Sequence, residues 1–84
     1  MSNYIKKEMK YKKVGEGYLF ENGIGLNETS FRIYELCEKE SNKDFIIEQL
    51  QKEYKVDHIE KEVFISEIKD CIDSMKEVGL IEEI

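Results

Sequence analysis

The chain has 84 residues, of which 40% are hydrophobic and 38% charged. This apolar content suffices for one small core and excludes a two-domain enzyme, so we expect residues 1–84 to form a single domain, with residues 1–10 as a first strand or a flexible segment. Proline is absent, and the sequence has neither an apolar run of about 18 residues nor a secretory signal segment. We therefore expect a cytoplasmic protein with no membrane partner.

The net charge of −6 is unevenly distributed along the chain. Residues 1–14 carry five lysines against one acid, Glu8, whereas residues 57–84 carry nine acids against three lysines. The acidic last third disfavours a phosphate backbone as its partner, so we expect no nucleic-acid ligand for that part.

Three short strands are expected in the first third of the chain. Residues 4–14 alternate apolar side chains with lysines, which suits an exposed edge strand. Residues 18–20 form a second apolar run, and Asn22-Gly23 is a strong hairpin signal that leads into residues 24–26. The pattern predicts an antiparallel meander.

From Asn27 onward the apolar period changes from two to about 3.6, which predicts three helices. Asn27 is a good N-cap for a first helix that ends near residues 38–40, and residues 41–42 offer caps for a second helix. Residues 57–60 resemble a capping box for a third helix that ends at Val78, with Gly79 as its C′ residue. The expected fold is α+β, a three-stranded antiparallel sheet followed by a three-helix bundle, in the order βββααα.

The usual catalytic constellations are missing from the sequence. His58 is the only histidine and has no cysteine or serine partner at a recognisable spacing, and the glycines at 23 and 25 are too few for a dinucleotide fingerprint. Cys37 and Cys71 lie in apolar helical patterns, which favours reduced core thiols over a disulfide between helices. We expect no enzyme, no metal site and no cofactor.

A binding role has better support. The apolar residues of the third helix cover more of its circumference than packing on one side requires, so part of this surface faces either a partner or the rest of the core. If residues 24–26 form the last strand of the meander, one backbone edge is open to an extended peptide. At Gly25 the backbone of such a peptide can approach closely.

Several segments together resemble the PqqD-like family, the recognition elements for precursors of ribosomally made, modified peptides. The segments that carry the resemblance are Tyr18-Leu-Phe20, Gly25-Leu-Asn-Glu-Thr29, Phe31-Arg-Ile-Tyr-Glu-Leu-Cys37, Phe45-Ile-Ile-Glu-Gln-Leu50 with Glu53-Tyr54, and Met75-Lys-Glu-Val-Gly-Leu-Ile81. The resemblance covers residue 11 to the end. It implies a fold like that of winged helix-turn-helix units.

The resemblance also implies a function and a partner. Members of this family hold the leader of a precursor peptide as an added strand beside the third helix, and a modifying enzyme, often a radical S-adenosylmethionine enzyme, then acts on the peptide. Carried over to this chain, the resemblance assigns backbone pairing and a groove wall, with Glu67 and Asp70 as rim charges. The peptide-binding residues it implies are Ile24, Gly25, Leu26, Phe64, Glu67, Ile68 and Cys71.

The chain departs from the family pattern at two places. Cys71 stands where a bulky aromatic residue is common, which implies a shallower or differently shaped pocket, and Glu38-Lys-Glu-Ser-Asn42 replaces a common Asp-Gly turn. Two other functions stay open at this stage: a winged-helix protein that binds nucleic acid through its lysines, and an adaptor that docks on an enzyme without reading a peptide. The sequence is compatible with a monomer or a dimer, and it names neither the precursor nor the modification.

Overall fold

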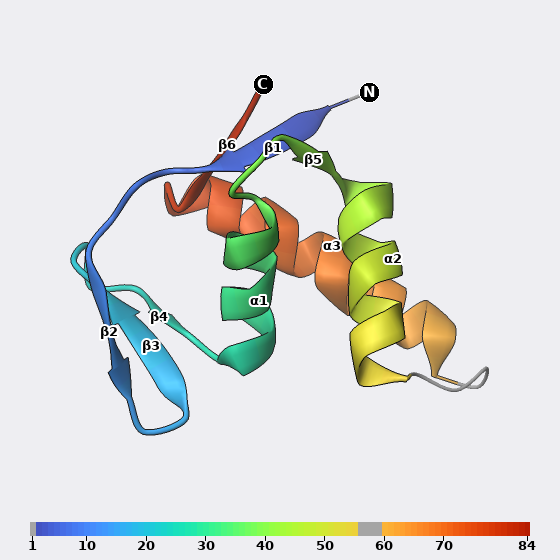
Figure 1. The fold of residues 1–84 in the computed structure, drawn as a ribbon, viewed down its shortest axis with the longest axis horizontal. Helices are drawn as coiled ribbons and strands as arrows, with labels where there is room; N and C mark the ends of the chain where they lie inside the picture. The colour runs from blue at the N-terminus through green and yellow to red at the C-terminus, as the bar shows by residue number, and fades with distance from the viewer. Residues whose placement is uncertain (1, 56–59) are drawn as a thin grey trace.

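The structure, a computed structural model, describes residues 2–55 and 60–84. In chain order the elements are β1 (Asn3–Lys6), β2 (Tyr11–Val14), β3 (Gly17–Phe20), β4 (Gly25–Leu26), α1 (Glu28–Leu36), β5 (Ser41–Asn42), α2 (Lys43–Tyr54), α3 (Lys61–Glu77) and β6 (Ile81–Glu83). Antiparallel strands thus precede three helices, which confirms the predicted α+β class (Figure 1).

The strands form two separate sheets, and this corrects the expectation of one strand over residues 4–14. That run is divided between β1, at the centre of the sheet β5-β1-β6, and β2, at one edge of the sheet β2-β3-β4. The alternation of side chains predicted extended structure, but it carries no information about which strand pairs with which. The partners of β1 lie far along the chain and comprise only two residues in β5 and three in β6.

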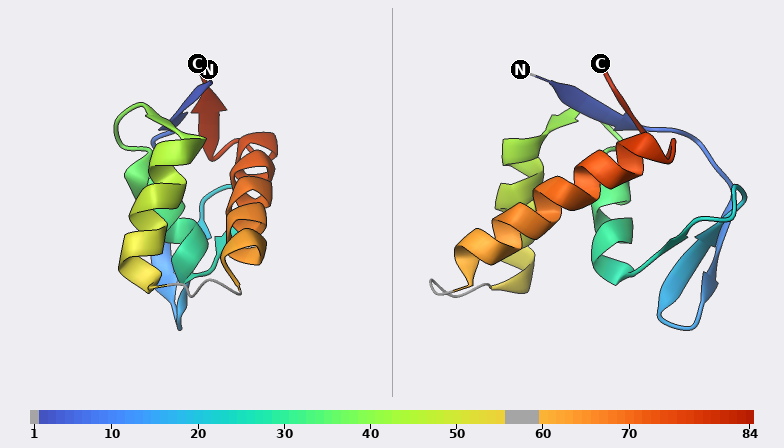
Figure 2. Two further views of the ribbon diagram at one scale, coloured as in Figure 1. Left: turned by 90° about the vertical axis from the view of Figure 1, so that its right-hand side faces the viewer. Right: turned by 180° about the vertical axis from the view of Figure 1, so that it is seen from behind.

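The sheet β5-β1-β6 fastens the two ends of the chain together. The N–H of Lys7 donates to the Leu80 carbonyl, and the N–H of Ile84 donates to the Asn3 carbonyl. Ile81, two residues after Gly79, begins β6 and pairs with Lys6. Both termini therefore lie at the same end of the molecule (Figure 2).

The sheet β2-β3-β4 is the predicted meander, and it packs beside α1. Its second turn contains Gly23 with a φ of +88°, and the N–H of Gly23 donates to the Phe20 carbonyl, as in a three-residue hairpin loop. The Tyr18 ring stacks on Phe31 of α1 with centroids 3.7 Å apart, which anchors β3 to that helix.

The helix ends follow the predicted caps where the structure describes them. Asn27 Oδ1 accepts the Ser30 N–H and Asn42 Oδ1 accepts the Phe45 N–H, each at 2.8 Å. Gly79 adopts a φ of +80°, and the N–H of Leu80 reaches back to the Met75 carbonyl, which is a Schellman ending for α3. The capping box was predicted at residues 57–60. Residues 57–59, which include His58, lie outside the described residues.

The first helix ends at Leu36, earlier than expected, because the chain turns there to place β5 beside β1. The Ser41 hydroxyl donates to the carbonyls of Leu36 and Lys39, which supports this turn.

The core lies where the three helices and both sheets meet, with α3 running across α1 and α2 (Figures 1 and 2). It does not absorb all the apolar surface of α3. Val63 and Val78 are 60% and 40% exposed, and Phe64, Ile65 and Cys71 are only partly buried. The fully buried side chains with the largest volumes are Tyr34, Phe20, Ile33, Ile46, Leu50, Ile72, Met75, Leu80, Ile81 and Cys37.

Candidate functional site

The strand β4 is an edge of its sheet, with its outer side open among the described residues. It pairs with β3 through the registers Tyr18↔Leu26 and Leu19↔Gly25. The N–H of Phe20 donates to the Ile24 carbonyl, and bonding directions alternate along an antiparallel ladder. The N–H and carbonyl of Gly25 therefore point away from β3, toward the open edge.

Gly25 is not required by the fold itself. Its φ lies outside the left-handed region, and a Cβ placed there would meet only the Tyr18 carbonyl oxygen, at an ordinary 3.9 Å. By contrast, a Cβ at Gly17 would meet the Leu26 carbonyl oxygen at 3.0 Å. The open space around Gly25 is thus available to something outside this chain.

A cavity of about 260 Å³ lies between the start of α1 and α3, directly after β4 in the chain. Four of the five α3 residues expected at the site line it: Phe64, Glu67, Ile68 and Cys71. The other lining residues come from the first turns of α1 and its cap: Asn27, Thr29, Ser30 and Ile33. The floor is partly polar, because the Ser30 hydroxyl and the Cys71 thiol lie 3.0 Å apart.

The other residues expected at the site have different positions. Ile24 is partly buried against the core, and Leu26 belongs to the core with 9% exposure. Ile68 is 2% exposed, so it contributes a floor to the cavity more than a wall. Asp70 is exposed on α3 and does not line the cavity.

Glu67 supplies negative charge at this cavity. Its carboxylate forms no ion pair with any residue in the described ranges, and the same holds for Asp70. Asp73, one turn of the helix further, is engaged by Lys43 at 2.9 Å. The side of α3 next to the cavity therefore attracts cations.

The two cysteines are free thiols in very different surroundings. Cys37 has no exposed surface, and burial raises the pKa of its thiol to about 11. Cys71 is only partly buried and borders the cavity, where its sulfur also contacts Met75 Sδ at 3.8 Å. Cys37 is a core thiol, as predicted. Cys71 instead lines the cavity of the candidate site.

Asn22 connects the two walls of the site. Its side-chain N–H donates to the Val78 carbonyl at the end of α3, and its Oδ1 accepts the Ile24 N–H at 3.2 Å. The turn before β4 is thus held to the end of α3, which sets the separation between the strand edge and the helix.

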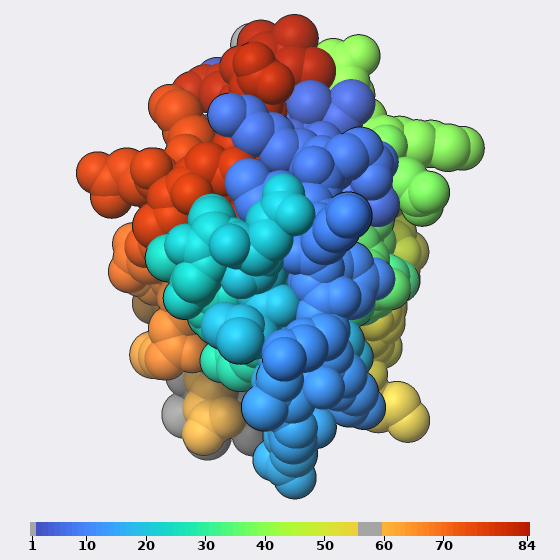
Figure 3. All heavy atoms as spheres, turned by 90° about the vertical axis from the view of Figure 1, so that its left-hand side faces the viewer, coloured from blue at the N-terminus to red at the C-terminus, as the bar shows by residue number. Residues whose placement is uncertain are grey.

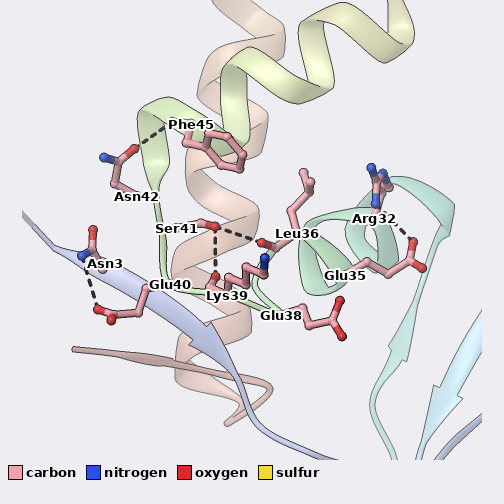
Figure 4. A pocket seen from close by; sticks show the side chains of 10 residues that line it. All are labelled: Asn3, Arg32, Glu35, Leu36, Glu38, Lys39, Glu40, Ser41, Asn42 and Phe45. Atoms are coloured by element: carbon pink, nitrogen blue, oxygen red, sulfur yellow. Dashed lines mark hydrogen bonds and ion pairs between the residues drawn. The ribbon is translucent and has the colours of Figure 1, made fainter.

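A larger cavity of about 570 Å³ lies elsewhere, around the turn between α1 and α2 (Figure 4). Most of its polar groups are already paired: Ser41 with backbone carbonyls, Asn3 with Glu40, and Arg32 with Glu35 and Glu53. The bidentate bonds to Glu53, at 2.8 and 2.9 Å, raise the pKa of Arg32 and lower the pKa of Glu53. These groups hold the turn in place, so we build the site on the smaller cavity.

Four residues that line the smaller cavity were not predicted as site residues: Asn27, which was predicted only as a helix cap, and Thr29, Ser30 and Ile33. Thr29 and Ser30 belong to the polar side of an amphipathic helix, which is normally solvated, and Ile33 follows the core pattern. Only the proximity of α1 and α3 in three dimensions identifies them.

The described residues contain no group of three or more His, Cys, Asp or Glu side chains placed to hold a metal ion. Within the same residues, no helix is long and apolar enough to cross a membrane.

The fold and the site define a small α+β protein in which an open strand edge leads into a cavity beside the last helix. The family model described as coenzyme PQQ synthesis protein D matches residues 16–81, most of the chain. The chain therefore belongs to the PqqD family. Comparison with the curated proteins and with the solved structures gave no match.

Proposed function

We propose that this protein is a non-catalytic accessory protein that captures the leader of a ribosomally made precursor peptide and presents it to a modifying enzyme. Membership of a family described as a coenzyme synthesis protein supports the accessory role. The single observation that carries peptide capture is the open edge of β4, which leads into a cavity lined by both α1 and α3.

The leader adds as a strand to the outer edge of β4. Gly25 supplies one outward N–H and one outward carbonyl, and these groups can pair with an extended backbone. Each such hydrogen bond contributes about 0.5–1.5 kcal/mol, so a short strand alone binds weakly.

A leader side chain fills the cavity and supplies the rest of the affinity. Phe64 and Ile68 offer apolar contacts, whereas Ser30 and Cys71 offer polar ones. Burial of one apolar anchor contributes about 1.5–3 kcal/mol, part of which offsets the cost of ordering the peptide. We expect affinities in the nanomolar to micromolar range, which take a handful of backbone hydrogen bonds and two or three such anchors.

Charge selects among leaders. Glu67 at the cavity and Asp70 beside it have no cation within the described residues, so leaders with Lys or Arg near the anchor bind better. Leader affinity should therefore fall as salt concentration rises.

The enzyme served is a radical S-adenosylmethionine enzyme in this proposal, which rests on the family resemblance. The modifying enzyme carries its own metal and cofactor, and this chain contributes binding alone.

The test is a titration of the labelled protein with the synthetic leader of a candidate precursor peptide, monitored by NMR and calorimetry. We expect shifts at residues 23–28 and 60–75. Phe64→Ala should weaken binding by about tenfold. Phe45→Ala is the matched control, because Phe45 is 44% exposed and borders the other cavity.

Two results would count against the proposal. If the leader does not bind while the modifying enzyme does, the protein is an adaptor that reads no peptide. If Phe45→Ala weakens leader binding as much as Phe64→Ala, the groove beside α3 is not the binding site.

A further inference from the structure

The exposed side of the sheet β2-β3-β4 has an unusual composition. Residues directly opposite each other in an antiparallel pair lie on the same side of a sheet. The registers Lys12↔Leu19, Val14↔Gly17 and Leu19↔Gly25 therefore place these five residues on one side, and Phe20 and Leu26 on the buried side. We call the five residues Lys12, Val14, Gly17, Leu19 and Gly25 the outer face.

The outer face is apolar and flat. Val14 is 53% exposed and Leu19 is 40% exposed. Two of the other three residues, Gly17 and Gly25, are glycines. On this side of the sheet β4 therefore carries no side chain, and Leu19 stands beside bare backbone. A solvent-facing sheet surface normally carries polar side chains, and a contiguous apolar surface indicates an interaction site.

The outer face is also basic, in a chain whose net charge is −6. It contains Lys12 and no acid, and a hollow of about 470 Å³ beside it is lined by Lys10, Lys12, Leu19 and one acid, Glu21, so positive charges outnumber negative ones there. Neither lysine forms an ion pair with a described residue. The surface therefore complements an apolar segment with acidic residues, a combination that fits protein better than nucleic acid.

The outer face adjoins the leader site, because both include Gly25. A leader strand added to β4 would extend the same sheet, so its backbone would continue this flat surface. The view of this side shows β2, β3 and the β4 region in blue and cyan across the front of the molecule, with α3 in orange at the margin (Figure 3).

We propose that the outer face is the docking surface for the peptide-modifying enzyme, which binds it through an apolar, acidic segment. The inference rests on the proposed function, since it places the enzyme beside the captured leader. It gives Gly25 a second role: a side chain there would project toward the enzyme and not into this chain.

The test uses the double variant Lys12→Glu/Leu19→Ser. The control is Lys52→Glu/Phe45→Ser, with the same charge change and an equally exposed apolar residue, both on α2. Affinity is measured separately for the synthetic leader and for a purified candidate peptide-modifying enzyme. Thermal unfolding by circular dichroism checks that both variants fold.

We expect the first variant to bind the enzyme at least about tenfold more weakly, with leader affinity within about twofold of the unchanged protein. The control should bind both partners normally. The inference is overturned if the first variant retains full enzyme affinity, if the control loses as much, or if the unchanged protein does not bind the enzyme. It is also overturned if the outer face binds duplex DNA tightly at low salt and the first variant abolishes that binding. Failure of the leader alone to bind would instead contradict the proposed function.

Discussion

The two sheets differ in what their edges and faces are used for. The sheet β5-β1-β6 has the N-terminal strand β1 at its centre, paired with β5 on one side and with β6 on the other, and contributes Tyr4 and Ile81 to the core. The sheet β2-β3-β4 has two open edges among the described residues, and its outer face is exposed. The sheet β5-β1-β6 joins the two ends of the chain through its hydrogen bonds. The sheet β2-β3-β4 instead leaves the backbone N–H and carbonyl of Gly25 available to a partner.

This difference shows how so small a protein separates stability from binding. Closing the fold through the distant residues of β1 and β6 leaves the meander free of that task, so its edge β4 need not be covered. Edge strands invite unwanted pairing, and the lysines of β2 discourage it on that side. The β4 edge has no charged side chain, which leaves it as the edge suited to a partner.

The largest expected effect is on the fastening sheet. Ile81→Ala removes a side chain that is 1% exposed and should lower the free energy of unfolding by about 2–5 kcal/mol. Leu19→Ala, in the other sheet, should change it by about 0.5 kcal/mol or less because Leu19 is 40% exposed. Urea unfolding measures both, and equal losses would remove the distinction between the sheets.

The second effect concerns the thiols. Iodoacetamide should modify Cys71 at least about a hundredfold faster than Cys37, because Cys37 is accessible only after the core opens. Bound leader should slow the Cys71 reaction and leave that of Cys37 unchanged. Mass spectrometry of the intact variants Cys37→Ala and Cys71→Ala separates the two rates. Unchanged reactivity of Cys71 at saturating leader would mean that the cavity stays empty.

The third effect tests the open edge. Gly25→Pro removes the outward N–H of β4 without loss of a bond to β3, and proline is tolerated on edge strands. Leader affinity should fall by about tenfold, the equivalent of one hydrogen bond of about 1.5 kcal/mol. Gly25→Ala keeps the N–H and should bind the leader nearly as well. Equal affinities for the proline and alanine variants, measured by calorimetry, would exclude pairing at Gly25.

The smallest expected effect is on stability and concerns the Arg32–Glu53 pair, which lies away from the leader site and from the outer face. Both side chains are 36% exposed, so Glu53→Gln should cost about 1 kcal/mol or less at pH 7. Since the hydrogen bond from Arg32 lowers the pKa of Glu53, the pair stabilises the fold above the ordinary carboxyl pKa, and this contribution is lost as the pH falls through the lowered pKa. The difference from the unchanged protein should therefore shrink as the pH falls through the lowered pKa of Glu53, and a difference that does not shrink with pH would show that the charge is not its cause.

The sequence predicted the local features well because their signals are local. Asn27 and Asn42 cap helices, Gly79 ends α3, and Asn22-Gly23 makes a hairpin, as expected. The first sheet could not be predicted, since β5 and β6 are too short to show a pattern and pair with a strand far away in the chain.

The α3 residues of the candidate site came from the family resemblance and not from a local signal. Phe64, Ile68 and Cys71 lie along one side of the helix, and the structure brings them to one cavity with Glu67. The depth of Ile68, the position of Asp70 outside the cavity and the contribution of Ser30 depend on how α1 and α3 pack together.

Hydrogen exchange at two backbone amides is the most direct test of strand addition. The amides of Gly25 and Lys13 both point outward, one at each open edge of the sheet β2-β3-β4. With bound leader, the account predicts slower exchange at Gly25 and no change at Lys13, measured residue by residue by NMR. Protection at Lys13 without protection at Gly25, or at neither amide under saturating leader, would contradict capture of the peptide on β4.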